Sequence, residues 1–409
     1  MIPVRKCFDK RVVRYLAACV AFLLLEGSMG VVLAQGPQDF IVTFREGMIP
    51  DVRAVSVVNA GAALRSNYQN VSAAAVTVPN QGALNALRSD PAVLSIIPDR
   101  PVFAFQRANK KPDNPGGGDG GGGGGGSAEQ VTPSGVQRVT GPNSNLNLDG
   151  SNVGVAVLDT GVDIGHSDLA VVDAFNAFDV EASCNDDNGH GTHVAGIVAA
   201  LDNGRDVIGV APAATIYCVK VLDSSGSGSD SIITQLHFVG VAVIVAAGNS
   251  PNLEVKDQVP ATYPEVIAVA STTAESGANQ CKRVDFSVEA DTASYFTSDG
   301  AFDEKTRIGV TVSAPGERLE NINKGCRLTS QGILSTQMGG GTRRESGTSM
   351  AAPHVAGIVA RLVQPGGLDV ESIRSMLRAS ADKLTDAPKD SPTSIYSFDQ
   401  EREGIAQAP

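Results

Sequence analysis

Four polar residues of this chain could carry out one reaction if the fold brings them together: Asp159, His190, Asn249 and Ser349. They supply a carboxylate, an imidazole, an amide and a hydroxyl. A serine hydroxyl is a weak nucleophile until an adjacent base takes its proton. Amide N–H groups aimed at a developing oxyanion stabilise it. These residue types therefore indicate acyl transfer through a serine nucleophile.

Ser349 alone does not decide the chemistry. It lies between Gly347 and an Ala/Val-rich run whose apolar spacing predicts a helix. Free backbone N–H groups and the positive end of the helix dipole meet at such a start, which favours an oxyanion there. A serine before a helix is nevertheless more often only an N-cap. The other three residues therefore have to be considered together with it.

The elements that must position these residues alternate between strands and helices from residue 129 onward. Continuous apolar runs predict buried strands at 153–158, 216–222, 241–247 and 266–270, and helical spacing predicts helices at 190–201, 351–362 and 370–380. This alternation is typical of an α/β fold with a doubly wound parallel sheet, which binds ligands at the carboxyl ends of its strands. Two of the four residues follow strands and two begin helices, so one edge of the sheet can gather them.

The blocks around these residues resemble the subtilisin-like serine peptidases, whose triad follows the chain order Asp, His, Ser. The resemblance runs from residue 129 to about residue 361 and implies a serine endopeptidase that hydrolyses peptide bonds through an acyl-enzyme, without a catalytic cofactor. It implies that Ser349 is the nucleophile, that His190 is the general base and then the acid, and that Asp159 fixes the tautomer of His190. The side chain of Asn249 and the backbone N–H of Ser349 would form the oxyanion hole.

The resemblance also implies a substrate strand and a structural calcium site. The substrate strand would be formed by Gly226, Ser227 and Gly228, pairing with an extended peptide. Calcium would bind the side chains of Gln130, Asp168 and Asn203 and the carbonyls of Leu201, Arg205 and Val207. Such an all-oxygen set suits calcium, and a plain polar loop is the alternative. A zinc pair of His190 with His193 is disfavoured, because no carboxylate or cysteine accompanies it at metal-motif spacing.

The N-terminal third predicts two segments that precede the catalytic part. A charged start, the apolar run 15–25 and small residues ending at Ala34 predict a signal peptide over 1–34, since the run is too short to span a bilayer. A lipoprotein cleavage box at 16–19 is a weaker interpretation, because the apolar run continues past it. Residues 37–106 predict the order strand–helix–strand–strand–helix–strand of a small α+β ferredoxin-like domain, and resemble the family's inhibitory propeptide.

The remaining boundaries follow from composition. A glycine-rich linker at 107–128 cannot bury enough surface to fold, and it separates the propeptide from a catalytic domain at 129–385. Residues 386–409 predict a polar tail. The resemblance places the mature N-terminus near residues 128–129, with autocleavage at the end of the linker. The propeptide would assist folding and occupy the substrate groove until it is cleaved.

The net charge and the number of cysteines limit which cellular compartment and which binding partners we expect for this protein. The 409 residues carry a net charge of −12, which argues against nucleic acid as a partner. We expect a secreted, extracellular monomer with protein or peptide substrates and no stable membrane association. Four cysteines remain after signal removal, and they allow three pairings; joining 184 to 218 and 281 to 326 is a guess among them.

Between residues 223 and 240 the chain is shorter than the family pattern, which has two helices and a further buried strand there. The stretch suffices for one crossover instead of two. The missing strand would lie in mid-sheet beside the one that ends at Asp159, and would form one wall of the pocket for the residue before the scissile bond.

Three explanations for this short stretch remain open. The sequence is an incorrect or spliced gene product, or the protein is an inactive relative, or the sheet closes up and keeps activity. We favour the first, because losing a central strand exposes large apolar surfaces. The rival function is a catalytically impaired protein of the same fold with a binding or scaffold role.

Overall fold

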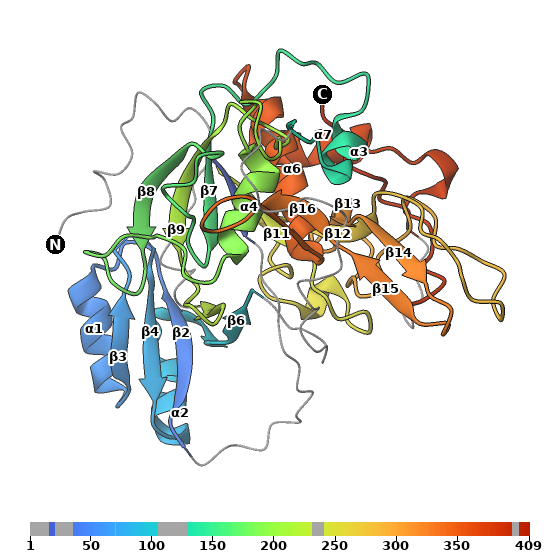
Figure 1. The fold of residues 1–409 in the computed structure, drawn as a ribbon. Coiled ribbons are helices and arrows are strands. Elements are labelled where there is room, and N and C mark those ends of the chain that lie inside the picture. The colour runs from blue at the N-terminus through green and yellow to red at the C-terminus, as the bar shows by residue number, and fades with distance from the viewer. Residues whose placement is uncertain (1–15, 21–35, 70, 105–128, 231–240, 395–400) are drawn as a thin grey trace. The chain divides into compact units, whose positions relative to one another are not determined.

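The computed structural model describes residues 16–20, 36–69, 71–104, 129–230, 241–394 and 401–409 (Figure 1). These residues divide into two compact units. The smaller unit contains 36–69, 71–102 and 227–230, and the larger unit contains the rest of the described residues. The predicted linker at 107–128, the predicted signal cleavage site at Ala34 and residues 231–240 of the short stretch lie outside the described residues.

The smaller unit has the predicted order of elements, β2-α1-β3-β4-α2-β5, with a four-stranded antiparallel sheet in the order β3-β4-β2-β5. The bounds are β2 Gln38–Phe44, α1 Pro50–Asn59, β3 Ala63–Asn67, β4 Ala73–Val78, α2 Gln81–Ser89 and β5 Val93–Pro98. Its core joins apolar residues of both helices, such as Val57 and Leu87, to apolar residues of the sheet, such as Phe44 and Val76.

Seven of the described strands form the central sheet of the larger unit, in the order β13-β12-β11-β1-β7-β9-β8, and every neighbouring pair is parallel (Figure 1). The bounds are β7 Gly154–Asp159, β8 Val171–Asn176, β9 Thr215–Lys220, β11 Ala242–Ala246, β12 Val266–Thr273 and β13 Val310–Glu317. From β7 the chain builds one side of the sheet and then crosses to the other. This is the predicted doubly wound parallel sheet, with its switch point beside β7.

The place between β7 and β11 is taken by β1, Leu16–Val20. Its backbone pairs with β7 from Leu16 opposite Gly154 onward, and with β11 from Ala17 opposite Ala242 onward. This is the mid-sheet place where the sequence analysis expected a strand to be missing. The expectation that this mid-sheet position is empty is therefore wrong. The expectation that the sheet closes up is wrong too, because an apolar segment assigned to the signal peptide supplies the backbone partner that β7 and β11 both need.

The helices of the larger unit are α3 Ser134–Thr140, α4 His190–Ala199, α6 Thr348–Val363 and α7 Val370–Ser380. Short elements complete it: the hairpin strands β14 Leu319–Ile322, β15 Leu328–Gln331, β16 Ile333–Thr336 and β17 Thr342–Glu345, and the 3₁₀ turns η2 Val255–Asp257 and η3 Leu384–Asp386. Helix α6 is almost entirely buried and contacts β11, β12 and β13, as well as α4. It therefore forms the centre of the core.

The predicted polar tail is wrong for residues 401–409. Ile405 bridges Ser313 of β13 and Asp382, and Ala406 belongs to the hydrophobic core. The cause is local: β13 is an edge strand with free backbone groups, and the last residues of the chain are largely apolar.

The two disulfides join Cys184 to Cys218 and Cys281 to Cys326, with Cα–Cα distances of 6.0 and 4.9 Å. The guessed pairing is confirmed. None of the described helices is long and apolar enough to cross a membrane.

Candidate active site

Asp159 and His190 form a buried pair at the carboxyl edge of the sheet. Asp159 is the last residue of β7, and His190 is the first residue of α4. The Nδ1 atom of His190 lies 2.7 Å from Oδ1 and 2.9 Å from Oδ2 of Asp159. An ionised carboxylate only accepts hydrogen bonds. The contact with the buried Asp159 therefore holds the proton of the neutral imidazole on Nδ1. Nε2 is then the atom that can act as a base.

The surroundings of His190 favour its charged form. Burial lowers the pKa of the imidazole, but the charge and the hydrogen bond of Asp159, together with the charges of Glu345 and Asp186, outweigh it and raise the pKa above its usual value. The imidazolium that forms when Nε2 accepts a proton is thereby stabilised.

Ser349 is the second residue of α6 and is 1% exposed. Its Oγ makes no hydrogen bond to any described residue. The hydroxyl is therefore not used as the N-cap that its sequence position also allowed; the N-cap position belongs to Gly347, and no side chain caps the helix there.

Asn249 is oriented toward the start of the same helix. Its Oδ1 accepts hydrogen bonds from the backbone N and from Oγ1 of Thr348, both at 2.8 Å. A Cβ built on Gly347 would lie 3.2 Å from Asn249 Nδ2 and 3.7 Å from the backbone N of Ser349. The nitrogen atoms of the two N–H donors expected to form an oxyanion hole therefore both lie close to Gly347.

Gly248 makes the approach of Asn249 possible. Its φ of +118° lies in the region that favours glycine, and a Cβ there would meet Ser298 Oγ at 2.8 Å. The turn from β11 into Asn249 therefore depends on this glycine.

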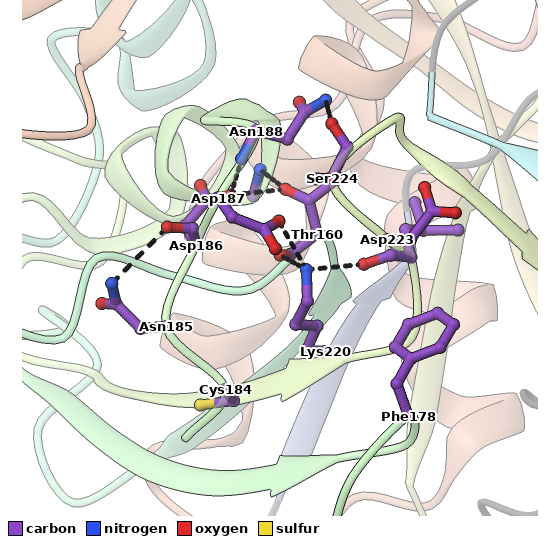
Figure 2. A network of polar contacts seen from close by, with 12 residues as sticks. Thr160, Phe178, Cys184, Asn185, Asp186, Asp187, Asn188, Lys220, Asp223 and Ser224 are labelled. Carbon is purple, nitrogen blue, oxygen red and sulfur yellow. Dashed lines mark hydrogen bonds and ion pairs between the residues drawn. The ribbon is translucent and has the colours of Figure 1, made fainter. Parts of the chain in front are cut away.

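Asp186, which was not predicted from the sequence, is a buried carboxylate in the loop before α4, and Figure 2 shows it among its polar neighbours. Its Oδ1 accepts from the backbone N of Gly189 at 2.8 Å and from Thr160 Oγ1 at 2.8 Å, and its Oδ2 accepts from the backbone N of Thr192 at 3.0 Å. Burial raises the pKa of Asp186, but these hydrogen bonds outweigh it and lower the pKa below its usual value. A charged Asp186 thus links the residue after Asp159 to the first turn of α4.

Lys220 supports the same region from the end of β9 (Figure 2). Its Nζ donates to the carbonyls of Thr160 at 2.6 Å and Leu222 at 2.9 Å, and to Asp187 Oδ1 at 2.7 Å. The signal that could have found both residues is the run of polar residues 185–188 directly before His190, together with a lysine closing a buried strand.

The other two histidines of these helices, His193 and His354, are structural. His193 Nε2 lies 3.1 Å from the carbonyl of Ile333, and burial lowers the pKa of His193 to about 3. His354 Nδ1 lies 2.8 Å from the carbonyl of Met350, and burial lowers the pKa of His354 to about 4. Both imidazoles are neutral hydrogen-bonding groups of the core.

The predicted substrate strand is linked to His190 through Asn188. Asn188 Oδ1 accepts from the backbone N of His190 at 3.2 Å, and its Nδ2 donates to the carbonyl of Ser224 at 3.1 Å. Just beyond, Gly226 accepts a hydrogen bond of 2.7 Å from the backbone N of Ala104. Strand β10, Ser227–Ser229, pairs with β6, Pro101–Phe103. Gly226 and β10 therefore pair with an extended segment of this chain itself.

A profile of the subtilase family matches residues 150–239 and 236–396 of the chain. The chain belongs to the subtilase family. It is 38% identical over 273 residues to Subtilisin Savinase of Lederbergia lenta, covering 62% of this chain and 93% of that protein. It is equally similar to the M-protease of Shouchella clausii (strain KSM-K16), of which it covers 66%.

Among solved structures, Sphericase aligns with a TM-score of 0.52 at 26% identity, and S41 Psychrophilic Protease with a TM-score of 0.51 at 27% identity. Each alignment covers 69% of this chain and all of the other. The resemblance noted from the sequence is thereby confirmed, and the chain is a subtilisin-like serine peptidase, a hydrolase.

The calcium ligands expected for this subtilase lie together around one loop. Gln130 Nε2 lies 2.5 Å from the carbonyl of Leu201 and 2.8 Å from that of Val207. Asn203 Nδ2 lies 2.9 Å from Asp168 Oδ1, and the backbone N of Val207 lies 3.3 Å from Asp168 Oδ2. Arg205 joins this set through its backbone N, which donates to Asn203 Oδ1 at 3.0 Å.

This donor set fits calcium. Burial raises the pKa of Asp168, which is fully buried, to about 6, and no lysine or arginine forms an ion pair with it among the described residues. A cation bound within the set would neutralise the charge of the ionised Asp168 carboxylate. Rotation of the side-chain amides of Gln130 and Asn203 would turn their oxygens toward the cation. No group of three or more His, Cys, Asp and Glu side chains among the described residues could hold a metal, so the set depends on amides and carbonyls.

Proposed function

We propose that this subtilase is a secreted serine endopeptidase that cleaves peptide bonds through an acyl-enzyme. The observation that carries the proposal is the pair of buried contacts between Asp159 and His190, at 2.7 and 2.9 Å. In the proposed mechanism, Asp159 orients His190, His190 is the general base, and Ser349 is the nucleophile.

In the first half-reaction, Ser349 Oγ attacks the carbonyl carbon of the peptide while its proton passes to Nε2 of His190. Asn249 Nδ2 and the backbone N of Ser349 donate to the oxyanion of the tetrahedral intermediate. The intermediate collapses when the imidazolium gives its proton to the leaving amine, and the acyl-enzyme remains. Water, deprotonated by His190, then releases the acid and restores the hydroxyl.

Steady-state hydrolysis of a peptide substrate tests the oxyanion assignment. Removing one such donor in a subtilisin lowers kcat by about 10²–10³. We expect Asn249→Ala to lower kcat of this chain by a similar factor with little change in KM, because the donor acts in the transition state. Ser250→Ala, one residue further along the same turn, is the control. An unchanged kcat in Asn249→Ala would exclude Asn249 from the oxyanion hole.

The domain organisation belongs to the same proposal. Residues 1–34 would be a signal peptide, 37–106 an inhibitory propeptide that also assists folding, 107–128 a linker, and 129–385 a catalytic domain with its mature N-terminus near residues 128–129. The support is the order of elements β2-α1-β3-β4-α2-β5 in residues 38–98, which is the order expected for the propeptide. N-terminal sequencing of the secreted protein checks it: a start at residue 35 or 37 contradicts autocleavage at the linker.

The calcium site is a further part of the proposal. Gln130, Asp168 and Asn203 would hold a structural calcium through side chains, with carbonyls of Leu201, Arg205 and Val207. The ion would neutralise the buried carboxylate and fix the loop that follows α4. The active-site steps do not involve it.

A second candidate is a catalytically impaired protein of the same fold that binds peptides without cleaving them. The observation that favours it is the source of the mid-sheet strand: residues 16–20 occupy that place instead of a strand from 223–240. A pocket wall that comes from another part of the chain would present different groups to a substrate. A folded protein that binds peptides but shows no hydrolysis would support this candidate.

A further inference from the structure

The hairpin formed by β16 and β17 lies against the first turns of α4. Ser335 Oγ of β16 donates to the carbonyl of His193 at 2.7 Å, and Thr336 Oγ1 donates to the carbonyl of Thr192 at 2.7 Å. β17 pairs antiparallel with β16 along its whole length. The hairpin is therefore fixed to the helix that begins with His190.

Arg343 and Glu345 of β17 form an ion pair at the start of this helix. The backbone carbonyl of Arg343 lies 3.2 Å from Nε2 of His193. A Cβ built on Gly189, the N-cap of α4, would lie 2.8 Å from Nη1 of Arg343. The guanidinium therefore covers the residue directly before His190, and it holds the carboxylate of Glu345 near the same turn.

One carboxylate oxygen of Glu345, Oε2, is buried and has no hydrogen-bond partner among the described residues. The side chain as a whole is 13% exposed. A buried carboxylate oxygen that lacks a donor is costly, so a positive charge that forms nearby stabilises it. The imidazolium of His190 is a charge of this kind, because it forms each time Nε2 takes up a proton.

We propose that Glu345 is a positioning residue of the general base: its carboxylate, held at the start of α4 by Arg343, stabilises the imidazolium of His190 and thereby sets the lowest pH at which the site works. The inference rests on the proposed function and names a regulation of that same site, its dependence on pH. Glu345 acts through His190 and takes no part in the bond-making steps.

The charges around His190 agree with this role. The titratable or charged groups of β7, of the loop before α4, of α4 itself and of β17 that lie around it are Asp159, Asp186, His193, Arg343 and Glu345. Burial lowers the pKa of His190, but the charges of Asp159, Glu345 and Asp186 outweigh it. Removing the charge of Glu345 should therefore lower the pKa of His190, so that the imidazole stays neutral and able to accept a proton at a lower pH.

The test is a titration of His190 by nuclear magnetic resonance in the full-length Ser349→Ala protein, which needs no catalysis. The signal of its imidazole Cε1–H is identified by its loss in His190→Ala. We expect Glu345→Gln to lower the pKa of His190 by about half a pH unit or more, because an opposite charge nearby favours the charged form of a group.

Two further variants separate the charge of Glu345 from its packing. Glu345→Asp keeps the charge and should retain most of the original pKa of His190. Glu275→Gln is the matched control, since Glu275 is also paired with an arginine, Arg318, at 3.1 Å, but is not among the groups around His190. It should leave the pKa of His190 unchanged. Equal shifts in Glu345→Gln and Glu345→Asp would assign the effect to displaced packing and overturn the inference.

An unchanged pKa of His190 in Glu345→Gln would also overturn the inference, whatever the catalytic activity proves to be. The proposed function is judged separately, by peptide hydrolysis in the protein with Ser349 intact. If that protein is active, the acid limb of its kcat/KM profile should move to lower pH in Glu345→Gln by the same amount as the pKa of His190. If it is inactive while the pKa of His190 still responds to Glu345, the role of Glu345 stands and the endopeptidase is refuted.

Discussion

At the scale of single residues, two buried carboxylates near the carboxyl edge of the sheet differ in the groups that surround them. Asp186 is surrounded by hydrogen-bond donors, which lower its pKa. Glu317, at the end of β13, lies beside Glu320, and burial together with the charge of Glu320 raises the pKa of Glu317 well above its usual value. One carboxylate therefore stabilises the loops as an anion, whereas the other is more stable when protonated.

Replacing Asp186 should therefore disturb catalysis through position. In Asp186→Asn the amide can accept on only one oxygen, while at least three donors point at the site. We expect kcat to fall by about tenfold or more, because small displacements of a catalytic base are costly. Asp187→Asn is the matched control, since Asp187 is half exposed and contacts Lys220 only through one oxygen. Equal kcat in both variants would contradict the positioning role.

Glu317 predicts a pH dependence of stability. The folded protein holds the proton of Glu317 to a higher pH than the unfolded chain does, so this group lowers stability as the pH rises above the unfolded pKa of about 4.3. Glu317→Gln should be more stable than the wild type at pH 8 by about 1 kcal/mol or more, and by less at pH 4. Thermal unfolding at both pH values measures this, with the exposed Glu265→Gln as control. A pH-independent difference would refute it.

The residues of the candidate site could be recognised from the sequence because each stands beside an apolar run. Asp159, His190 and Ser349 mark the ends or starts of predicted elements. Asp186 and Lys220 were not recognised, because a charged residue in a polar loop or at a strand end is usually solvated. The structure shows that both side chains are buried.

At the scale of elements, the apolar runs predicted the strands and helices that carry the site, whereas β14 to β17 are short and half polar and gave no periodic signal. The last nine residues were misjudged, because the polar stretch before them hides a short apolar segment that pairs with β13. For β1 the limit is physical: the same apolar run suits a signal peptide or a buried strand, and local pattern does not identify a partner.

The loop after α4 predicts a response to calcium removal. If calcium binds the set around Asp168, a chelator should lower the unfolding temperature by several degrees, since binding at a hundred times Kd contributes about 2.7 kcal/mol. Asp168→Asn should abolish this response. Asp206→Asn should retain it, because Asp206 lies in the same loop outside the proposed ligand set. A melting curve that the chelator leaves unchanged in the wild type would contradict the site.

At the scale of the whole molecule, β1 lies in the segment that the proposed signal peptidase cleavage would remove, so the proposed secreted enzyme is active only if its sheet remains folded without β1. β7 and β11 each pair with it along the strand. Without it, both strands would expose unpaired backbone groups in the middle of the sheet. This relation joins residues more than a hundred positions apart, and for that reason no local pattern in the sequence revealed it.

Two truncated chains measure this dependence. A chain that begins at residue 35 lacks β1 and should unfold at a clearly lower temperature than the full chain, or aggregate through the open strands. A chain that begins at residue 16 keeps β1 and should match the full chain. Equal unfolding temperatures for the two truncated chains would show that β1 contributes nothing to the stability of the sheet.

The central claim is that Ser349 is an activated nucleophile in this chain. Labelling with a fluorophosphonate probe, followed by mass spectrometry of the modified peptide, tests it most directly, because the probe reacts with a serine only when its base and oxyanion hole are in place. We expect stoichiometric labelling at Ser349 that is lost in Ser349→Ala and strongly slowed in His190→Ala. Folded protein, shown to unfold cooperatively, that takes up no label at Ser349 would contradict it.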